Sequence, residues 1–351
     1  MEKNVANNLM ALSNAFNRRM PTAFNALDSI DKYLDEDIFL SVRDTERHVL
    51  THIDDKHELR FTKMLFCRGL NAIYTWKWHK KIYEIDKDLE SLLIEQYIGD
   101  MIMEPSILKK LPFNGMCIHM STYEDIYVII TVDYIRAAWA SIIKDQYKSG
   151  LGDNDKALYF HIYRADKLSK LEDGDDEDMM TMLPVILSIP LIDNKTILEC
   201  IDTISFKANS VSEKEDIKTY MMQVLNVLMY ILSANADIRK RSINQSTLNK
   251  KHKRYKKQLQ GLEIFEVGFV LGETIRMNKN ISKRESDPFE TRTGATTSKR
   301  PHVRCGHWQH YWTGKRSDPS QRRRVLKWIH PCLVNPVAKE AVDVYIHPVK
   351  K

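Results

Sequence analysis

The spacing of apolar residues changes twice along this chain, and this change limits the possible fold more than any other feature. In the first hundred residues, apolar side chains recur at helical intervals, as in residues 58–85 and 86–99. Across residues 111–191, β-branched and aromatic runs alternate with polar or glycine-containing breaks. Helical spacing returns in residues 196–206 and 213–234. The pattern predicts an α+β fold, in which helices pack on a central antiparallel meander of about four strands.

The composition of the 351 residues is that of an ordinary globular protein, with 43% apolar and 28% charged residues. This balance excludes collagen-like, mucin-like and fully disordered chains. The longest apolar stretch, residues 221–234, contains Gln223 and Asn226, so we expect a buried helix and no membrane span. The N-terminus lacks the pattern of an export signal, and the five cysteines form no CxxC pair. We therefore expect reduced thiols and a cytoplasmic location.

Charge is distributed unevenly, although the net charge is only +6. Residues 239–330 contain 23 Lys and Arg against 7 Asp and Glu, whereas residues 1–238 contain 27 against 38. An acidic body therefore carries a basic C-terminal third. A basic region usually faces an anionic partner, most often RNA or DNA, but it can equally face the acidic body across an internal interface. Charge alone leaves both interpretations open.

Changes in composition divide the chain into four consecutive segments. We expect a helical N-terminal region over residues 1–110 and an α+β core with antiparallel strands over residues 111–238. A basic linker with a short apolar element then covers residues 239–298. The last segment, residues 299–351, is expected to be an aromatic and basic β-hairpin module with a Gly-His-Trp sequence.

Four shorter stretches have their own interpretation. Residues 239–258 are basic and nearly free of apolar side chains, which predicts an exposed helix end and a linker. The polar residues 278–298 predict a flexible linker. Residues 137–147 can form a helix that interrupts the meander. The acidic residues 172–178 lack the ligand pattern of a calcium loop, so we interpret them as a solvated loop.

Residues 300–335 predict a β-hairpin, because two arms rich in β-favouring residues flank a turn that contains Gly, Asp and Pro. With a turn centred on Ser317, Gly306 lies opposite Trp328, and Trp308 lies diagonally from Trp328 on the same face. A Trp over a cross-strand Gly covers exposed backbone. Strand alternation places on this face His302, Arg304, Trp308 and Trp312, and on the other His307 and Tyr311.

Three kinds of chemistry are compatible with this hairpin. Its His and Cys side chains can bind zinc, but their spacing matches no common zinc site, and alternation scatters them over both faces. Its cations and flat rings are the ingredients of a site for single-stranded nucleic acid. Its aromatic residues can also simply form the small core of the module. We expect no metal and no other cofactor. The candidate residues for binding peptide or RNA are His302, Arg304, His307, Trp308, Tyr311, Trp312, Arg322, Arg323, Arg324 and Trp328.

Signatures of common enzymes are missing from the sequence. It contains no GxSxG, GxxxxGK[ST], HExxH or GxGxxG motif. His307 and His310 can titrate near neutral pH, as an acid and a base for RNA cleavage must, but their spacing alone does not support that role. We therefore expect a binding protein, and a ribonuclease is the enzymatic alternative.

The tail sequence KRPHVRCGHWQHYWTG, followed by LKWIHPCLVN, resembles the C-terminus of a type V-A anti-CRISPR family of phages and plasmids. The resemblance covers most of the chain and is strongest after residue 299. It extends to four other stretches, residues 68–86, 106–120, 224–238 and 266–276. The tail residues that match or nearly match the family pattern are Arg300, Pro301, His302, Arg304, Gly306, His307, Trp308, Tyr311, Trp312, Gly314, Trp328 and Pro331.

This resemblance implies a function that requires no catalysis. Family members act against the type V-A CRISPR effector nuclease by recognising its N-terminal peptide during translation, with loss of its message. The implied partners are that peptide and also the ribosome or mRNA, and the implied location is the host bacterial cytoplasm. The alternative is an RNA-binding protein or ribonuclease of a mobile element that acts through the basic aromatic tail.

The chain also departs from the family pattern. The pattern has a basic residue, a His and no Cys at the positions of Cys305, Gln309 and Cys332. These differences argue further against a zinc site. They leave open whether this chain keeps the family's target or serves another one. A third interpretation is a plasmid-maintenance protein that shares only the tail module.

Overall fold

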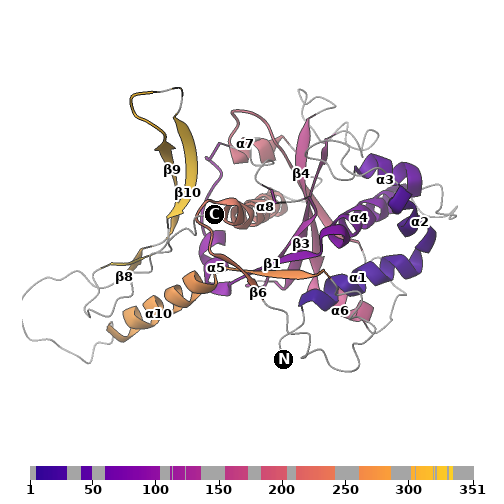
Figure 1. Ribbon diagram of the computed structural model, residues 1–351, viewed down its shortest axis with the longest axis horizontal. Helices are drawn as coiled ribbons and strands as arrows, with labels where there is room; N and C mark the ends of the chain where they lie inside the picture. The colour runs from indigo at the N-terminus through magenta and orange to yellow at the C-terminus, as the bar shows by residue number, and fades with distance from the viewer. Residues whose placement is uncertain are drawn as a thin grey trace, which may run out of the picture. The chain divides into compact units, whose positions relative to one another are not determined.

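The structure is a computed structural model of the whole chain, and Figure 1 shows its helices and strands. The described residues are 5–29, 41–49, 60–102, 111–112, 114–122, 124–135, 155–172, 183–203, 211–241, 261–285, 302–304, 306–318, 320, 322–329 and 332–334. The fold is α+β, as the sequence predicts, with a central sheet, packed helices and a C-terminal hairpin.

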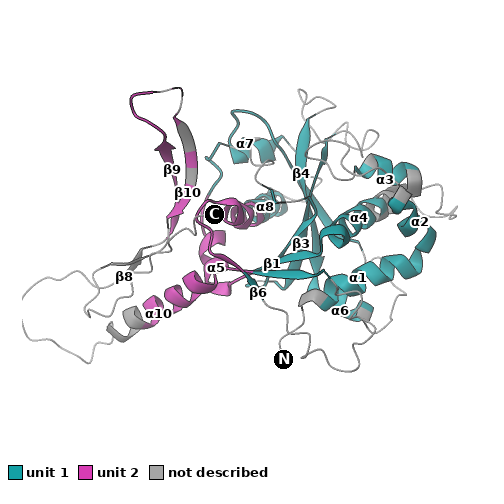
Figure 2. Cartoon of the chain, viewed as in Figure 1, with its two compact units in different colours: residues 1–84, 98–222, 240–265 teal, residues 85–97, 223–239, 266–351 magenta. Residues whose placement is uncertain are grey.

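The chain divides into two compact units, which Figure 2 shows in different colours. The first unit contains most of the central sheet and consists of residues 1–84, 98–222 and 240–265. The second unit contains the C-terminal hairpin and consists of residues 85–97, 223–239 and 266–351. Neither unit is a continuous piece of chain, so segments that are distant in sequence fold together in each.

The predicted meander is present as four consecutive antiparallel strands. They are β2 (Met116–Met120), β3 (Ile126–Tyr134), β4 (Lys156–Arg164) and β5 (Val185–Pro190). Their register aligns Ile129 with Cys117 on one side and with His161 on the other. Nearly every side chain of β2, β3 and β4 is buried, as expected for strands that are covered on both faces.

The sheet has three more strands, and one of them corrects the helix expected across residues 58–85. The strand order is β5-β4-β3-β2-β1-β7-β6. Helix α4 (Arg60–His79) ends at His79, and β1 (Lys81–Ile85) pairs in parallel with β2. Lys80, between them, adopts a left-handed backbone with φ of 51°, which an α-helix does not allow. The prediction of a continuous helix was therefore wrong for residues 80–85.

A second correction concerns the first residues of the basic stretch 239–258, which form a strand and not a helix end. β6 (Ile238–Arg241) lies next to β7 (Glu263–Val267) at one end of the sheet. Lys240 forms an ion pair with Glu263, and Arg241 Nη2 lies 2.5 Å from Glu84 Oε2. Acidic residues of β7 and β1 thus pair with these cations, an arrangement that helical spacing does not reveal.

Helices cover the sheet in the first unit and share its core. Besides α4, they include α1 (Val5–Arg19), α2 (Pro21–Ala26), the 3-10 helix η1 (Leu27–Ser29), α3 (Val42–Val49) and α6 (Ala165–Glu172). Helix α1 packs against α4 and α6, and α4 packs against β3. The core here includes Leu9, Phe16, Trp76 and Tyr127, each at most 1% exposed. Trp76 is thus a core residue.

Two of the other described helices, α5 and α7, start at recognisable caps. Helix α5 (Lys87–Ile94) starts after Asp86, whose carboxylate accepts hydrogen bonds from the backbone N–H groups of Asp88 and Leu89. Helix α7 (Ile197–Asp202) has a capping box formed by Thr196 and Glu199. Helix α8 covers Val211–Leu232.

Helix α10 (Phe269–Glu285) corrects the prediction that a flexible linker starts at residue 278. Asn278 is 5% exposed, and Ile275, one turn earlier, is 1% exposed. The apolar face of α10 therefore remains in contact with its unit after the polar sequence begins. The remaining part of that linker, residues 286–298, lies outside the described residues.

Several sequence interpretations fall on stretches that the structure does not describe. These stretches are residues 137–147, residues 173–178 of the acidic loop, and residues 242–258.

Among the helices that are described, none is long and apolar enough to span a membrane. Cys67, Cys117 and Cys200 are buried and are not part of a disulfide.

Candidate functional site

The C-terminal hairpin consists of two paired strands, β9 (His307–Thr313) and β10 (Arg323–Ile329). Trp308 lies directly opposite Trp328, and Thr313 lies opposite Arg323. The expected pairing of Gly306 with Trp328 was therefore wrong by two residues. The turn is centred on Asp318 and not on Ser317, because the Asp318 carboxylate accepts hydrogen bonds from the backbone N–H and the hydroxyl of Ser320.

The part of the hairpin near Gly306 is a packed aromatic cluster. The rings of Trp308 and Trp328 meet edge to face, with centroids 5.2 Å apart, and Trp328 is fully buried. Tyr230 of α8 lies against Trp328 at right angles, with centroids 6.4 Å apart. A Cβ on Gly306 would lie 2.4 Å from Trp328 Cζ2, so only glycine fits there. The expected covering of Gly306 by a Trp is thus confirmed in spite of the different register.

Asn226, in the middle of the apolar part of α8, connects this cluster to the rest of the second unit. Its Nδ2 donates hydrogen bonds to the carbonyl oxygens of Leu93, at 2.5 Å, and Gln96, at 3.1 Å. Its Oδ1 accepts a hydrogen bond of 2.7 Å from Trp308 Nε1. Both donors and the acceptor of this fully buried side chain are therefore satisfied by two distant segments.

A second asparagine and an aspartate complete the attachment. Asn235 Nδ2 donates a hydrogen bond of 2.7 Å to the carbonyl oxygen of Trp328. Asp237 Oδ2 accepts hydrogen bonds from the backbone N–H groups of Val270 and Leu271, at the start of α10. The polar residues that follow α8 thus hold both the hairpin and α10.

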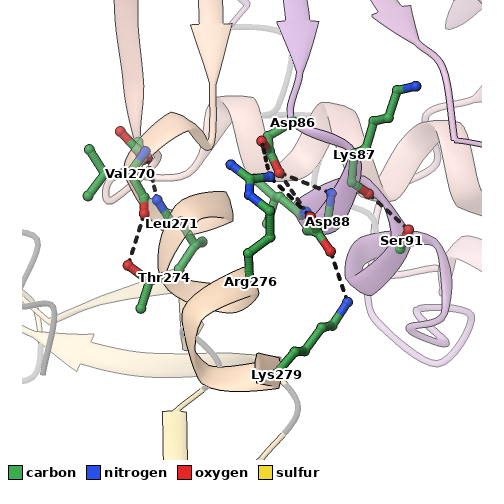
Figure 3. Close-up of polar contacts among 11 residues, drawn as sticks. Asp86, Lys87, Asp88, Ser91, Val270, Leu271, Thr274, Arg276 and Lys279 are labelled. Carbon is green, nitrogen blue, oxygen red and sulfur yellow. Dashed lines mark hydrogen bonds and ion pairs between the residues drawn. The ribbon is translucent and has the colours of Figure 1, made fainter. Parts of the chain in front are cut away.

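Helices α5 and α10 are joined by a cluster of charged side chains, which Figure 3 shows in close-up. Arg276 Nη1 lies 2.8 Å from Asp86 Oδ2 and 3.0 Å from Asp88 Oδ2. Lys279 Nζ lies 3.0 Å from Asp88 Oδ1. Burial alone would raise the pKa of Asp88, but the hydrogen bonds from Lys279 and Arg276 outweigh it and lower that pKa. The cluster is a structural clamp between the two helices.

The outer part of the hairpin presents its aromatic rings to solvent. Trp312 is 62% exposed, and Arg322 Cζ lies 5.0 Å from the centroid of its ring. Tyr311 is 37% exposed, and Lys327 Nζ lies 5.6 Å from its ring centroid. Both distances fit cation–π contacts. Consecutive strand residues point to opposite faces, so each face of the hairpin presents one of these ring–cation pairs.

The structure separates the ten predicted site residues into groups. Half-buried Trp308 and fully buried Trp328 form the packed aromatic cluster, which supports the interpretation that part of the aromatic set is a structural core. Tyr311, Trp312 and Arg322 belong to the exposed outer part. The others are placed by their strands: half-buried His307 in β9, Arg323 and Arg324 in β10, and His302 and Arg304 in β8 (His302–Arg304), which pairs with β11 (Cys332–Val334). Their role in binding remains a prediction.

Sequence reasoning missed Asn226, Asn235 and Asp237 as the residues that attach the hairpin and α10. The available signal was Asn226 itself, a polar residue within the apolar part of α8. A buried polar side chain needs partners, and these partners come from elsewhere in the chain.

As for metals, the part of the chain that the structure describes has no group of three His, Cys, Asp or Glu side chains that could hold an ion.

The fold and the site define an α+β protein with a seven-stranded sheet and a C-terminal hairpin that is anchored at one end and basic and aromatic at the other. The model of the AcrVA2-like family, described as the anti-CRISPR type V subtype A2 family, matches residues 83–336. This match covers most of the sheet and the whole hairpin, and the chain belongs to this anti-CRISPR family.

A solved structure supports the assignment of the fold. The crystal structure of AcrVA2 is similar to this chain with a TM-score of 0.52 and 16% sequence identity. The match covers 93% of this chain and 99% of that chain, so the likeness extends over both proteins. A comparison with curated protein sequences finds no match.

Proposed function

We propose that this chain lowers the production of a type V-A CRISPR effector nuclease by recognising the effector's N-terminal peptide during translation, with loss of the effector message. The observation that carries this proposal is the family match over residues 83–336. The protein acts in the host bacterial cytoplasm, where the effector is made, and it acts by binding, without catalysis of its own.

An extended peptide can be captured at the edge of a sheet, where it adds one more strand. β5 is the last strand at one end of the sheet order, and among the described residues no strand pairs with its outer side. Val185, at the start of β5, is 62% exposed. A segment that leaves the ribosome exposes the backbone groups that such pairing requires, whereas the folded effector buries them. This edge therefore suits a nascent chain better than a finished protein.

Timing is the decisive test. The purified protein, added to a pre-assembled effector–guide complex, is expected to leave cleavage of target DNA unchanged. Co-expression with the effector gene is expected to lower both effector protein and effector message. As a control, compensating frameshifts change the effector's first residues while the message sequence stays almost the same, and the loss is expected to disappear. Inhibition of the assembled complex at stoichiometric concentration would show that the protein blocks its target directly.

The strand edge can be tested separately. Val185→Lys places a charge on β5 that disfavours pairing with another strand, and it is expected to abolish the loss of effector protein in co-expression. Val211→Lys is the matched control, since Val211 is 80% exposed at the start of α8. If both variants keep wild-type activity, the peptide binds elsewhere. Cleavage of naked RNA by the purified protein would favour a ribonuclease.

A further inference from the structure

We infer that the outer part of the hairpin binds single-stranded RNA, with Trp312 and Tyr311 as stacking platforms for bases and with Arg322 and Lys327 beside the phosphates. The inference goes beyond the proposed function, because it concerns a different surface and a different partner from the captured peptide. It does not depend on the identity of the effector.

The first argument is a division of the hairpin into two parts. Trp308 and Trp328 are used internally, since Trp308 donates to Asn226 and Trp328 is fully buried. Trp312 has no such structural task, and 62% of its surface is exposed. Exposure by itself is common, since Trp78 is exposed to a similar degree, but it leaves the Trp312 ring accessible to a base.

The second argument is the position of the cations. The Arg322 guanidinium lies 5.0 Å from the Trp312 ring centroid, and the Lys327 ammonium lies 5.6 Å from that of Tyr311. Stacking between a base and an aromatic ring, with a cation next to that ring, is how many proteins bind single strands without sequence preference. Each ring–cation pair offers one base a flat surface and its phosphate a positive charge.

The third argument is the charge of the hairpin as a whole. Residues 307–329 contain six Lys and Arg and one Asp. This excess attracts a polyanion, and most of the binding free energy then depends on salt. A duplex keeps its bases stacked inside, so exposed rings favour single-stranded RNA over double-stranded RNA. An acidic peptide matches the charge but has no flat bases for the two rings, so RNA fits both features better.

The test uses the full-length protein and a fluorescein-labelled single-stranded oligouridine, followed by fluorescence anisotropy. Trp312→Ala is expected to weaken binding about tenfold, as loss of one stacked base does. Trp78→Ala is the matched control, because Trp78 is an exposed tryptophan of similar exposure, 55%, on α4, and it is expected to leave the affinity unchanged. Equal affinities of the two variants would overturn the proposal.

Salt dependence and competition complete the experiment. Arg322→Gln is expected to reduce the slope of log affinity against log salt by about 0.7, the value for one phosphate contact on a single strand. Duplex RNA and polyglutamate are expected to compete poorly with the labelled strand. Equally strong competition by polyglutamate would show that the surface binds acidic peptides. Binding is measured without effector or ribosome, so its failure is distinct from failure of the proposed function.

Discussion

Asn226 illustrates how a single side chain can determine the arrangement of several segments. Its three hydrogen bonds connect α8 to the end of α5 and to the first tryptophan of the hairpin. A buried amide that loses one partner costs about 1–3 kcal/mol, so alternative arrangements of these segments are disfavoured. A leucine at this position would suit the helix but would specify neither neighbour.

The two tryptophans of β9, Trp308 and Trp312, are expected to contribute very differently to stability. Trp308→Ala removes a ring packed on Trp328 and leaves the Asn226 acceptor unpaired, so it is expected to lower the free energy of unfolding by about 3 kcal/mol. Trp312→Ala removes an exposed ring from the same strand, and a change within about 0.5 kcal/mol is expected. Urea unfolding of both variants measures the difference, and similar losses would contradict the packing role of Trp308.

Asp133 is expected to make stability depend on pH in the first unit. It is 2% exposed and accepts hydrogen bonds from the backbone N–H groups of Val42 and Tyr134, both at 2.8 Å. Burial raises its pKa to about 6, although those hydrogen bonds and the charge of Arg68 act in the opposite direction. The folded protein therefore holds this proton more tightly than the unfolded chain, whose carboxyl group titrates near its ordinary value.

As the pH rises from about 4 to about 6, the unfolded carboxyl group loses its proton first, so this group's contribution to stability decreases. The unfolding free energy of the wild type relative to Asp133→Asn is expected to fall by about 2 kcal/mol between pH 4 and pH 7. Urea unfolding of both proteins at the two pH values measures it. His161, whose pKa burial lowers to about 3, contributes equally to both proteins and cancels. A constant difference would show that Asp133 does not titrate in this range.

At the scale of elements, the contact between α5 and α10 depends on a helical glycine. A Cβ on Gly272 would lie 2.1 Å from Asp86 Oδ1. The same carboxylate caps α5 and pairs with Arg276, so it has little freedom to move away. Glycine inside a helix normally reduces stability, by about 1 kcal/mol relative to alanine, and here it makes room for the cap.

Gly272→Ala is therefore expected to destabilise the protein, by about 1–3 kcal/mol, in spite of its better helix propensity. Asp86→Ala alone removes the cap of α5 and is expected to cost about 1 kcal/mol. The double variant removes the collision, so its loss is expected to be smaller than the sum of the two single losses. Thermal unfolding of the four proteins gives the coupling, and strict additivity would contradict the close contact.

The elements with long, uniform patterns could be predicted from the sequence. The four strands of the meander, the buried helix around Asn226 and the C-terminal hairpin follow from period and turn residues alone. β1 and β6 could not be predicted in this way, because each is short and owes its conformation to neighbouring strands. β1 lies between β2 and β7, and the basic β6 is paired with acidic side chains from distant segments.

The sequence indicates which residue types the hairpin with the candidate site contains, but not how they are arranged on its two strands. The register of the hairpin depends on the hydrogen bonds that Asp318 makes within the turn, and a shift of one residue in the turn centre moves each cross-strand partner by two. Which tryptophan of β9 is packed depends on α8, far earlier in the chain: Trp308 and its hydrogen-bond partner Asn226 are 82 residues apart. Local alternation cannot distinguish the ring that faces α8 from the ring that faces solvent.

At the scale of the whole molecule, the second unit consists of three segments that only tertiary contacts hold together. A substitution that weakens the contacts of one segment should therefore also speed hydrogen exchange in the other two. In hydrogen exchange followed by mass spectrometry, Trp308→Ala is expected to speed exchange in residues 85–97 and 223–239, to which Trp308 is linked through Asn226. Residues 116–134 of the first unit are expected to keep wild-type rates. Trp312→Ala serves as the control, and a uniform increase throughout the chain would contradict the division into two units.

The hydrogen bond between Trp308 and Asn226 also has a consequence for the biosynthesis of the protein itself. The 82 residues between the two partners take about 4–16 s to synthesise at roughly 5–20 residues per second. During that interval α8 has already been made, but its amide acceptor and the aromatic ring of Tyr230 still lack their hairpin partners. A message that ends before β9 yields a chain in which this surface stays uncovered. The described contacts of the hairpin with α8 can therefore form only after β10 has been translated.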